Sequence, residues 1–277
     1  MHSNNPVFAR SEGFSGRQTT PTYPGGGAYS DPSTWQTGGP GDGGVGTGVQ
    51  ERMTIDSVVL RTATTLFLLV AVAAATWVVL PDLSEPGVST GSTMMAWMVG
   101  AFGGLGVALV ISFKKVINPA LVLVYAALEG LFIGAMSKYF EAMWPGIVMS
   151  AVFGTFIAFA ATLAAYKFFN IRVTPRFRKV VTIAAFGFVG MVMLDFVLGF
   201  FGASFGWNEL NGLGMVATVI GLVLGVLMLV LDFDFVERGV EAGLPERESW
   251  RAAFGLTVTL VWLYIEMLRL IAALRGE

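Results

Sequence analysis

Seven long apolar runs follow one another through most of the chain, and short polar segments separate them. Each run spans roughly 19 to 23 residues, which is enough for an α-helix to cross a hydrocarbon core of about 30 Å. The runs are Thr62–Leu80, Thr93–Phe113, Pro119–Tyr139, Ile147–Tyr166, Val180–Phe201, Leu213–Leu231 and Ala252–Leu274. We therefore predict an all-α integral membrane protein, a bundle of seven transmembrane helices.

The start of the chain has a different pattern. Residues 1–53 are rich in Gly, Pro and Ser, as in "TYPGGGAYSDPSTWQTGGPGDGGVGTG". Such a composition cannot bury enough apolar surface to offset the entropy lost on ordering, so we predict a disordered tail followed by a transmembrane domain over 54–277. The tail lacks the charged start and apolar core of a cleaved signal peptide, and the first span is expected to direct insertion.

Residues just before the first span carry the signals of a helix that begins in water. In "MTIDSVVLRTA" we predict that Thr54 caps the helix and that Asp56 lies in its first turn. Arg61 is then expected at the interface between water and membrane.

Composition agrees with a polytopic membrane protein, because 55% of the 277 residues are hydrophobic and only 13% are charged, and the mean hydropathy is +0.70. The net charge of -2 and the lack of a basic stripe argue against a nucleic-acid partner. With no Cys and only His2, the chain has no means to form disulfides, Fe–S clusters, thiolate zinc sites or bis-His haem. We expect no enzymatic activity and no resident cofactor.

The loops differ in charge from one side of the predicted bundle to the other. Lys138 and Arg275 are the basic residues on one side. The opposite side has Arg52, Lys114, Lys115, Lys167, Arg172, Arg176, Arg178, Lys179, Arg238, Arg247 and Arg251. Because Lys and Arg accumulate in cytoplasmic loops, we predict a cytoplasmic N-terminus and an extracytoplasmic C-terminus. A re-entrant seventh segment would instead return the C-terminus to the cytoplasm.

Three carboxylates interrupt the apolar spans. Glu129, Asp195 and Glu266 lie in the third, fifth and seventh spans. A charge within a span costs about 2.5–3.5 kcal/mol on insertion scales and usually faces the bundle interior or a water-filled cavity. Counted from the start of their spans, all three acids lie at similar depths, so we predict one polar cluster on an ion path. The alternative is that each acid serves only packing, with Arg269 one turn from Glu266 as a partner.

Two further acids close the sixth span in "LVLDFDFVERG". Residues two apart on a helix diverge by about 200°, so only one of Asp232 and Asp234 is expected to face the bundle. Asp232 shares the face of Gly221 and Gly225, and we predict that it forms an ion pair with Lys114 or Lys115 at the cytoplasmic mouth, with snorkelling of Asp232 to the interface as the alternative. Asp234 is expected to be exposed in a row with Glu237 and Glu241.

Several segments together resemble the Bax inhibitor-1/YccA family, in the actinobacterial-type branch that has a long Gly/Pro tail. They are "NPALVLVYAALEGLFIGAMSKYFE", "MWPGIVMSAVFGTF", "IRVTPRFRK", "LVLDFDFVERGVEAGLPERESWRAAFGL" and "VTLVWLYIEMLRLI". The likeness runs from about Thr54 to the C-terminus. It implies a seven-helix protein of the bacterial plasma membrane that acts as a pH-sensitive calcium leak, with Ca²⁺ or protons as permeant ions and no firmly assigned metal site.

The family's pH sensor, as the resemblance implies it, is a pair of aspartates on the sixth and seventh helices bridged to a basic residue near the end of the second. Asp232 matches the first aspartate, and Lys114 or Lys115 matches the basic residue. The position of the second aspartate falls near Thr259, and Glu266 is the candidate substitute. A carboxylate suits both tasks of a leak, because it binds Ca²⁺ and protons.

Other functions remain open at this stage. The resemblance also implies contact with a membrane-bound AAA protease, so a non-conducting regulator that binds another membrane protein is the main alternative. An intramembrane aspartyl protease is disfavoured because Asp195 and Asp232 lie at different depths and no Gly-x-Gly-Asp signature is present. A transporter with inverted repeats is disfavoured by the odd number of helices.

Overall fold

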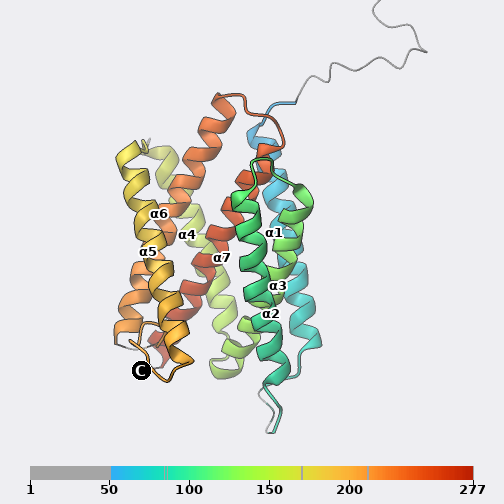
Figure 1. Ribbon diagram of the computed structural model, residues 1–277, viewed down its shortest axis with the longest axis vertical. Coiled ribbons are helices and arrows are strands. Elements are labelled where there is room, and N and C mark those ends of the chain that lie inside the picture. The colour runs from blue at the N-terminus through green and yellow to red at the C-terminus, as the bar shows by residue number, and fades with distance from the viewer. Residues whose placement is uncertain (1–50, 84, 86, 170, 211, 277) are drawn as a thin grey trace, which may run out of the picture. The chain divides into compact units, whose positions relative to one another are not determined.

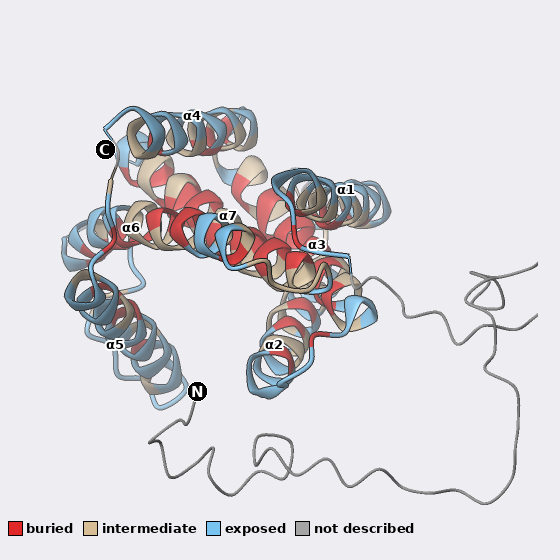
Figure 2. Ribbon diagram, turned by 90° about the horizontal axis from the view of Figure 1, so that it is seen from above, coloured by how far each residue is buried: buried red, intermediate tan, exposed pale blue. Residues whose placement is uncertain are grey.

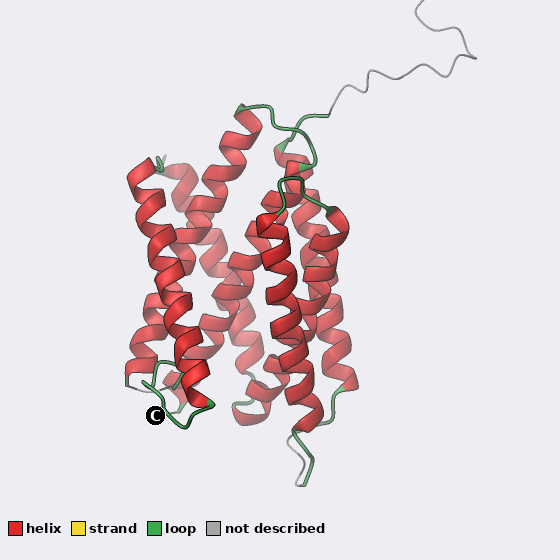
Figure 3. Cartoon of the chain, viewed as in Figure 1, coloured by secondary structure: helices red, strands yellow, loops and turns green. Residues whose placement is uncertain are grey.

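The computed structural model describes residues 51–276 except 84, 86, 170 and 211, and in them the chain forms seven α-helices. The predicted disorder of the tail falls on residues outside this range. The helices are α1 (Ile55–Val79), α2 (Gly91–Phe113), α3 (Pro119–Met143), α4 (Ile147–Phe168), α5 (Pro175–Gly199), α6 (Leu213–Glu241) and α7 (Glu248–Arg275) (Figures 1 and 3). All seven are long and apolar enough to cross a membrane. The predicted fold class is confirmed.

Local capping residues start three of these helices. Thr54 accepts a hydrogen bond from the backbone N–H of Ser57 and closes a capping box, as predicted for the start of α1. The side chains of Asn118 and Thr174 accept a backbone N–H at the starts of α3 and α5, without a capping box, and each residue is followed by a proline at the first helical position. Proline fits there because its missing N–H would have no partner inside the helix.

Helix α7 lies in the middle of the bundle. It packs against α1, α3, α4 and α6, and it is the helix with the largest buried share (Figure 2). The backbones of α2 and α5 approach one neighbour each among the described helices, α3 and α6, but their side chains reach further: the rings of Phe102 of α2 and Phe196 of α5 have centroids 6.3 Å apart. The continuous helix Glu248–Arg275 leaves no re-entrant break in the seventh span. The central position of α7 makes its polar side chains neighbours of several helices at once.

Two pairs of glycines allow the closest helix contacts. A Cβ on Gly130 or Gly134 would lie 2.5 Å from the Leu69 carbonyl or 2.6 Å from the Ala73 carbonyl of α1. On α6, a Cβ on Gly221 would lie 2.6 Å from the Glu266 carboxyl group of α7. Both GxxxG segments therefore pack against neighbouring helices, as their spacing predicts.

The first described residues run beside the α6–α7 loop. Met53 donates its backbone N–H to the Leu244 carbonyl at 2.7 Å, and Glu246 donates to the Glu51 carbonyl at 2.7 Å. The Met53 side chain is fully buried. Arg61 forms an ion pair with Glu246 at 2.9 Å and lies over the Trp250 ring, so it ties α1 to the start of α7.

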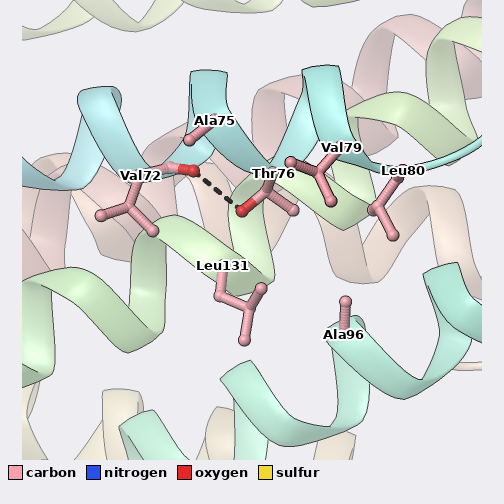
Figure 4. A pocket seen from close by; sticks show the side chains of 7 residues that line it. All are labelled: Val72, Ala75, Thr76, Val79, Leu80, Ala96 and Leu131. Carbon is pink, nitrogen blue, oxygen red and sulfur yellow. Dashed lines mark hydrogen bonds between the residues drawn. The ribbon is translucent and has the colours of Figure 1, made fainter.

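Two apolar hollows open between helices. The larger, about 740 Å³, lies between α1 and α4, with α3 and α7 behind it, and Ala73, Gly134 and Tyr264 are among its lining residues. The smaller, about 390 Å³, lies between α1, α2 and α3. The hydroxyl group of Thr76 in its lining donates a hydrogen bond to the Val72 carbonyl (Figure 4). Neither hollow presents a cluster of free polar groups, so neither resembles an ion site.

The helix order puts all the loops rich in Lys and Arg at one end of the bundle, which we call the basic end. Residues 51–54, the α2–α3 and α4–α5 loops and the α6–α7 loop meet there, at the top of Figure 1. The last described residues lie at the opposite end. The predicted separation of charge between the two ends is therefore present in the fold.

Candidate functional site

One face of α7 carries a line of polar and small residues that faces α6. Gly255, Thr259, Trp262, Glu266 and Arg269 follow one another at intervals of four, three, four and three residues, which is the spacing of a single helix face. The facing residues of α6 are Asp232, Gly225 and Gly221. We call this contact between α6 and α7, defined by these eight residues, the α6–α7 seam.

The half of the seam nearer the basic end is built around Asp232. Thr259 donates its hydroxyl group to Asp232 Oδ2 at 2.5 Å, and a Cβ on Gly255 would lie 3.2 Å from Asp232 Oδ1. The absence of a side chain at Gly255 is thus what lets the carboxylate reach α7. Thr259 is the residue at which the family resemblance placed a second aspartate, so a hydroxyl donor occupies that position here.

The predicted ion pair between Asp232 and a lysine of α2 does not form. Lys114 and Lys115 are both exposed, and neither forms an ion pair among the residues that the structure describes. The reason lies in the packing: the two lysines are exposed at the end of α2, whereas Asp232 points toward Gly255 and Thr259 of α7. The family's basic bridge therefore has no counterpart at these two lysines.

Asp234 is buried, which corrects the prediction of an exposed charge. Only 4% of the residue is exposed, and its carboxylate accepts hydrogen bonds from Arg178 of α5 at 2.5 Å and from Arg238 of α6 at 2.9 Å. The prediction that the side chains of Asp232 and Asp234 point in different directions is correct. The side chain of Asp234, however, points toward α5 and not toward water. Asp234 therefore joins α5 to α6.

The other half of the seam contains a buried ion pair. Glu266 and Arg269 are 4% and 8% exposed, and their charged groups approach to 3.6 Å. Arg269 also donates to the Trp207 carbonyl in the α5–α6 loop at 3.0 Å. Glu266 Oε2 has no hydrogen-bond partner among the described residues. The predicted neighbourhood of Glu266 and Arg269 is confirmed, and the pair faces Gly221 of α6.

Trp262 separates the two halves. Its ring stacks on Phe188 of α5 with centroids 5.6 Å apart and an interplanar angle of 20°. Its Nε1–H donates to the Gly221 carbonyl at 3.1 Å. An aromatic side chain anchored to both α5 and α6 thus lies between Thr259 and Glu266.

Glu129 lies away from the seam. Its Oε1 would be 2.9 Å from a Cβ on Gly104, so the side chain faces α2, and its Oε2 is buried without a hydrogen-bond partner in the described structure. Glu266 instead faces α6. The two acids are therefore on different sides of the bundle and do not share a contact.

The predicted cluster of the three acids does not form in the described structure. Asp195 lies four residues before the end of α5, beside the α5–α6 loop, whereas Glu129 faces α2 and Glu266 faces α6. Their common depth stays a prediction, because α5 and α7 begin with polar turns ahead of the apolar runs and the position of a residue within its helix does not give its depth in the membrane. No group of three acidic side chains suited to a metal occurs in the described part of the chain.

Asp195 anchors a loop. It is 3% exposed and accepts hydrogen bonds from the backbone N–H groups of Phe205 at 2.6 Å and Asn208 at 2.9 Å, and from the Ser204 hydroxyl at 3.3 Å. These bonds hold the α5–α6 loop against the end of α5, and Trp207 of the same loop receives Arg269. The structure places Asp195 among loop donors and not beside the other acids.

Gly255, Thr259 and Trp262 belong to the α7 side of the seam but were not predicted as site residues. The signal was nevertheless present, because the four-three-four-three spacing links them to Glu266 and Arg269. The hydroxyl group of Thr259 and the indole of Trp262 do not ionise in the physiological range, so the charges in the spans did not point to them. The chemistry available along the seam is hard oxygen ligation, from carboxylate and hydroxyl groups, with no fixed multidentate cage.

Comparison with known proteins agrees with this architecture. A family model described as "Bax inhibitor 1 like" matches residues 5–276. A protein of Chlamydia muridarum (strain MoPn / Nigg), described as an uncharacterized protein, is 25% identical over 187 residues, which cover 64% of this chain and 76% of that relative. The family match extends over both halves of the seam.

Proposed function

Because the chain belongs to the Bax inhibitor 1-like family of proteins, we propose that it is a pH-sensitive cation leak of the bacterial plasma membrane, with Ca²⁺ as a permeant ion. The proposed path follows the α6–α7 seam from the basic end to the opposite end. The basic end is cytoplasmic in this proposal, because cytoplasmic loops collect Lys and Arg.

One observation carries the proposal: Asp232 lies within a membrane-spanning helix, forms no ion pair in the described structure, and is held by the hydroxyl group of Thr259. A carboxylate inside a span is costly, and such groups usually mark a path for ions or protons. Unlike Asp234 and Glu266, Asp232 has no arginine partner in the described structure, so its carboxyl group is available to an exchangeable ligand.

Protons are proposed to act through the bond between Asp232 and Thr259. A hydrogen bond to an ionised carboxylate is roughly twice as strong as one between neutral groups. Protonation of Asp232 therefore weakens the tie between α6 and α7, and the seam loosens. Cations then pass the oxygen atoms of Asp232, Thr259 and Glu266 one at a time, which suits a leak better than a storage site.

Purified protein in liposomes tests the proposal. We expect that Ca²⁺ entry, followed with an enclosed dye, exceeds that of protein-free liposomes and rises as the pH falls below neutrality. A parallel proton dye tells whether H⁺ moves with Ca²⁺ or alone. Protein that is folded and correctly inserted but gives no cation flux at any pH between 5 and 8, roughly the range in which perturbed carboxyl groups titrate, would exclude the leak.

A second candidate is a non-conducting regulator that binds a membrane protein such as a membrane-bound AAA protease. The apolar hollow between α1 and α4 favours it, since Ala73, Ala74 and Gly134 in its lining are small enough to admit a partner helix. Substituting Ala74 by Leu should then abolish partner binding while leaving the seam intact. Removing residues 1–50 separates the candidates further, because a leak should survive the truncation.

A further inference from the structure

We propose that Trp262, stacked on Phe188, is the constriction that closes the α6–α7 seam. The proposal rests on the proposed leak and adds the residue at which the path is shut. Trp262 comes three residues after Thr259 and four before Glu266, so along α7 it is about 4.5 and 6 Å from them. It is the largest side chain on this face of α7.

The indole is held by three helices. It belongs to α7, stacks on Phe188 of α5, and donates a hydrogen bond to the Gly221 carbonyl of α6. A Cβ on Gly221 would lie 2.7 Å from the tip of the Phe188 ring, so this glycine leaves the space that the aromatic pair fills. Stacking and the hydrogen bond together fix the orientation of the ring.

Unsatisfied polar atoms lie beyond the indole, on the side away from the basic end. Thr218 is 1% exposed and its Oγ1 has no hydrogen-bond partner in the described structure. Glu266 Oε2 also forms no hydrogen bond there, although the guanidinium group of Arg269 lies 3.6 Å from it. Thr218 is three residues before Gly221, on the same face of α6. Buried polar atoms normally have a protein or water partner. The seam is therefore polar on both sides of Trp262 and apolar at it.

An aromatic pair between two polar segments hinders ions, because its apolar rings offer no oxygen atom to replace the water around an ion and the nearby Gly221 carbonyl is already bonded to the indole N–H. Phe188 belongs to α5, whose backbone approaches only α6 among the described helices, so the stack can separate without breaking the contacts of α7 with α1, α3 and α4. Loosening of the bond between Asp232 and Thr259 on the same face of α7 is the event that would release it.

Flux through variants gives the first test. We expect Trp262→Ala to raise Ca²⁺ flux at neutral pH about tenfold, the change that corresponds to a barrier lower by about 1.4 kcal/mol. Trp262→Phe keeps the stack but loses the N–H donor, and should give a smaller rise. Trp262→Phe also keeps the proposal testable if Trp262→Ala does not fold. Trp97→Ala is the matched control, since Trp97 packs edge-on against Phe132 and Tyr139 away from the seam.

Thiol labelling gives the second test and does not depend on flux. The chain contains no cysteine, so Thr218→Cys introduces a single thiol beyond the indole. A small cationic thiol reagent added at the basic end of oriented vesicles should modify it about tenfold faster when Trp262→Ala is also present, for the same reason of a lower barrier. Trp97→Ala should leave the rate unchanged.

The two measurements separate this proposal from the leak itself. Faster labelling in the Trp262→Ala background without cation flux in any variant would support the constriction and overturn the proposed leak. Wild-type flux that Trp262→Ala and Trp262→Phe leave unchanged, with unchanged labelling of Thr218→Cys, would overturn the constriction and leave the leak standing.

Discussion

Asp232 and Asp234 are two residues apart and have different surroundings. Asp232 receives a hydroxyl group from α7, whereas Asp234 receives two guanidinium groups, one of them from α5. The first arrangement leaves a carboxylate whose charge has no fixed counter-ion in the described structure. The second neutralises the charge and joins two helices. The two aspartates therefore differ in role, although they are the same residue type two positions apart.

The role of Asp234 can be tested by its stability effect. We expect Asp234→Asn to lower the free energy of unfolding by about 1–3 kcal/mol, because Arg178 and Arg238 lose a buried acceptor, although both arginines are half-exposed and partly screened by water. Thermal melting in detergent measures the change. Glu241→Gln, an exposed acid at the end of the same helix, is the control. Equal melting temperatures for the two variants would mean that the arginine contacts contribute nothing.

At the scale of the helices, α1 and α3 depend on two glycines for their contact. Gly130→Ala should destabilise the protein by about 1–3 kcal/mol, because the new Cβ meets the Leu69 carbonyl at 2.5 Å and backbone must shift. Gly190→Ala in α5 is the matched substitution, since a Cβ there has no neighbour within 4 Å. Ala favours a helix over Gly by about 1 kcal/mol, so that variant should melt at the same or a higher temperature. Destabilisation of similar size in both would refute the close contact.

Glu129 and Glu266 lie on different elements and face different neighbours, α2 and α6. We expect Glu266→Gln to reduce cation flux and Glu129→Gln, which lies away from the seam, to leave it unchanged, so the double variant should match Glu266→Gln within about 0.5 kcal/mol. Flux in liposomes at fixed pH measures all three. A loss of flux in Glu129→Gln that Glu266→Gln does not increase would show that the acids share one site, as their spacing along the apolar runs predicted.

The sequence predicted the helices better than it predicted their faces. Apolar runs placed all seven spans, and Thr54 marked the start of α1, because length, hydropathy and capping are local properties. The neighbours of a side chain depend on which helix packs where. The burial of Asp234 under α5 and the turn of Glu129 toward α2 were therefore missed. The bond from Thr259 to Asp232 was missed for the same reason, although the family resemblance had singled out both positions.

For the whole molecule, we expect the basic end to set the orientation in the membrane. We expect a reporter that works only outside the cytoplasm to be active when it is fused after residue 277, and a reporter that works only in the cytoplasm to be active when it is fused before residue 1. The reason is that the loops at the basic end carry most of the Lys and Arg. If the fusions showed both termini in the cytoplasm, this topology would be contradicted, and both ends of α7 would lie on one side of the membrane.

The proposed leak depends most on Asp232, and the flux of Asp232→Asn across a pH series is its most direct test. The neutral amide resembles the protonated acid, so it should weaken the tie to Thr259 at every pH. We expect Ca²⁺ flux at neutral pH close to that of the wild type in acid, with little further dependence on pH, whereas Glu241→Gln should keep the wild-type profile. An Asp232→Asn variant that conducts no more than the wild type at neutral pH and retains its pH dependence would contradict the account.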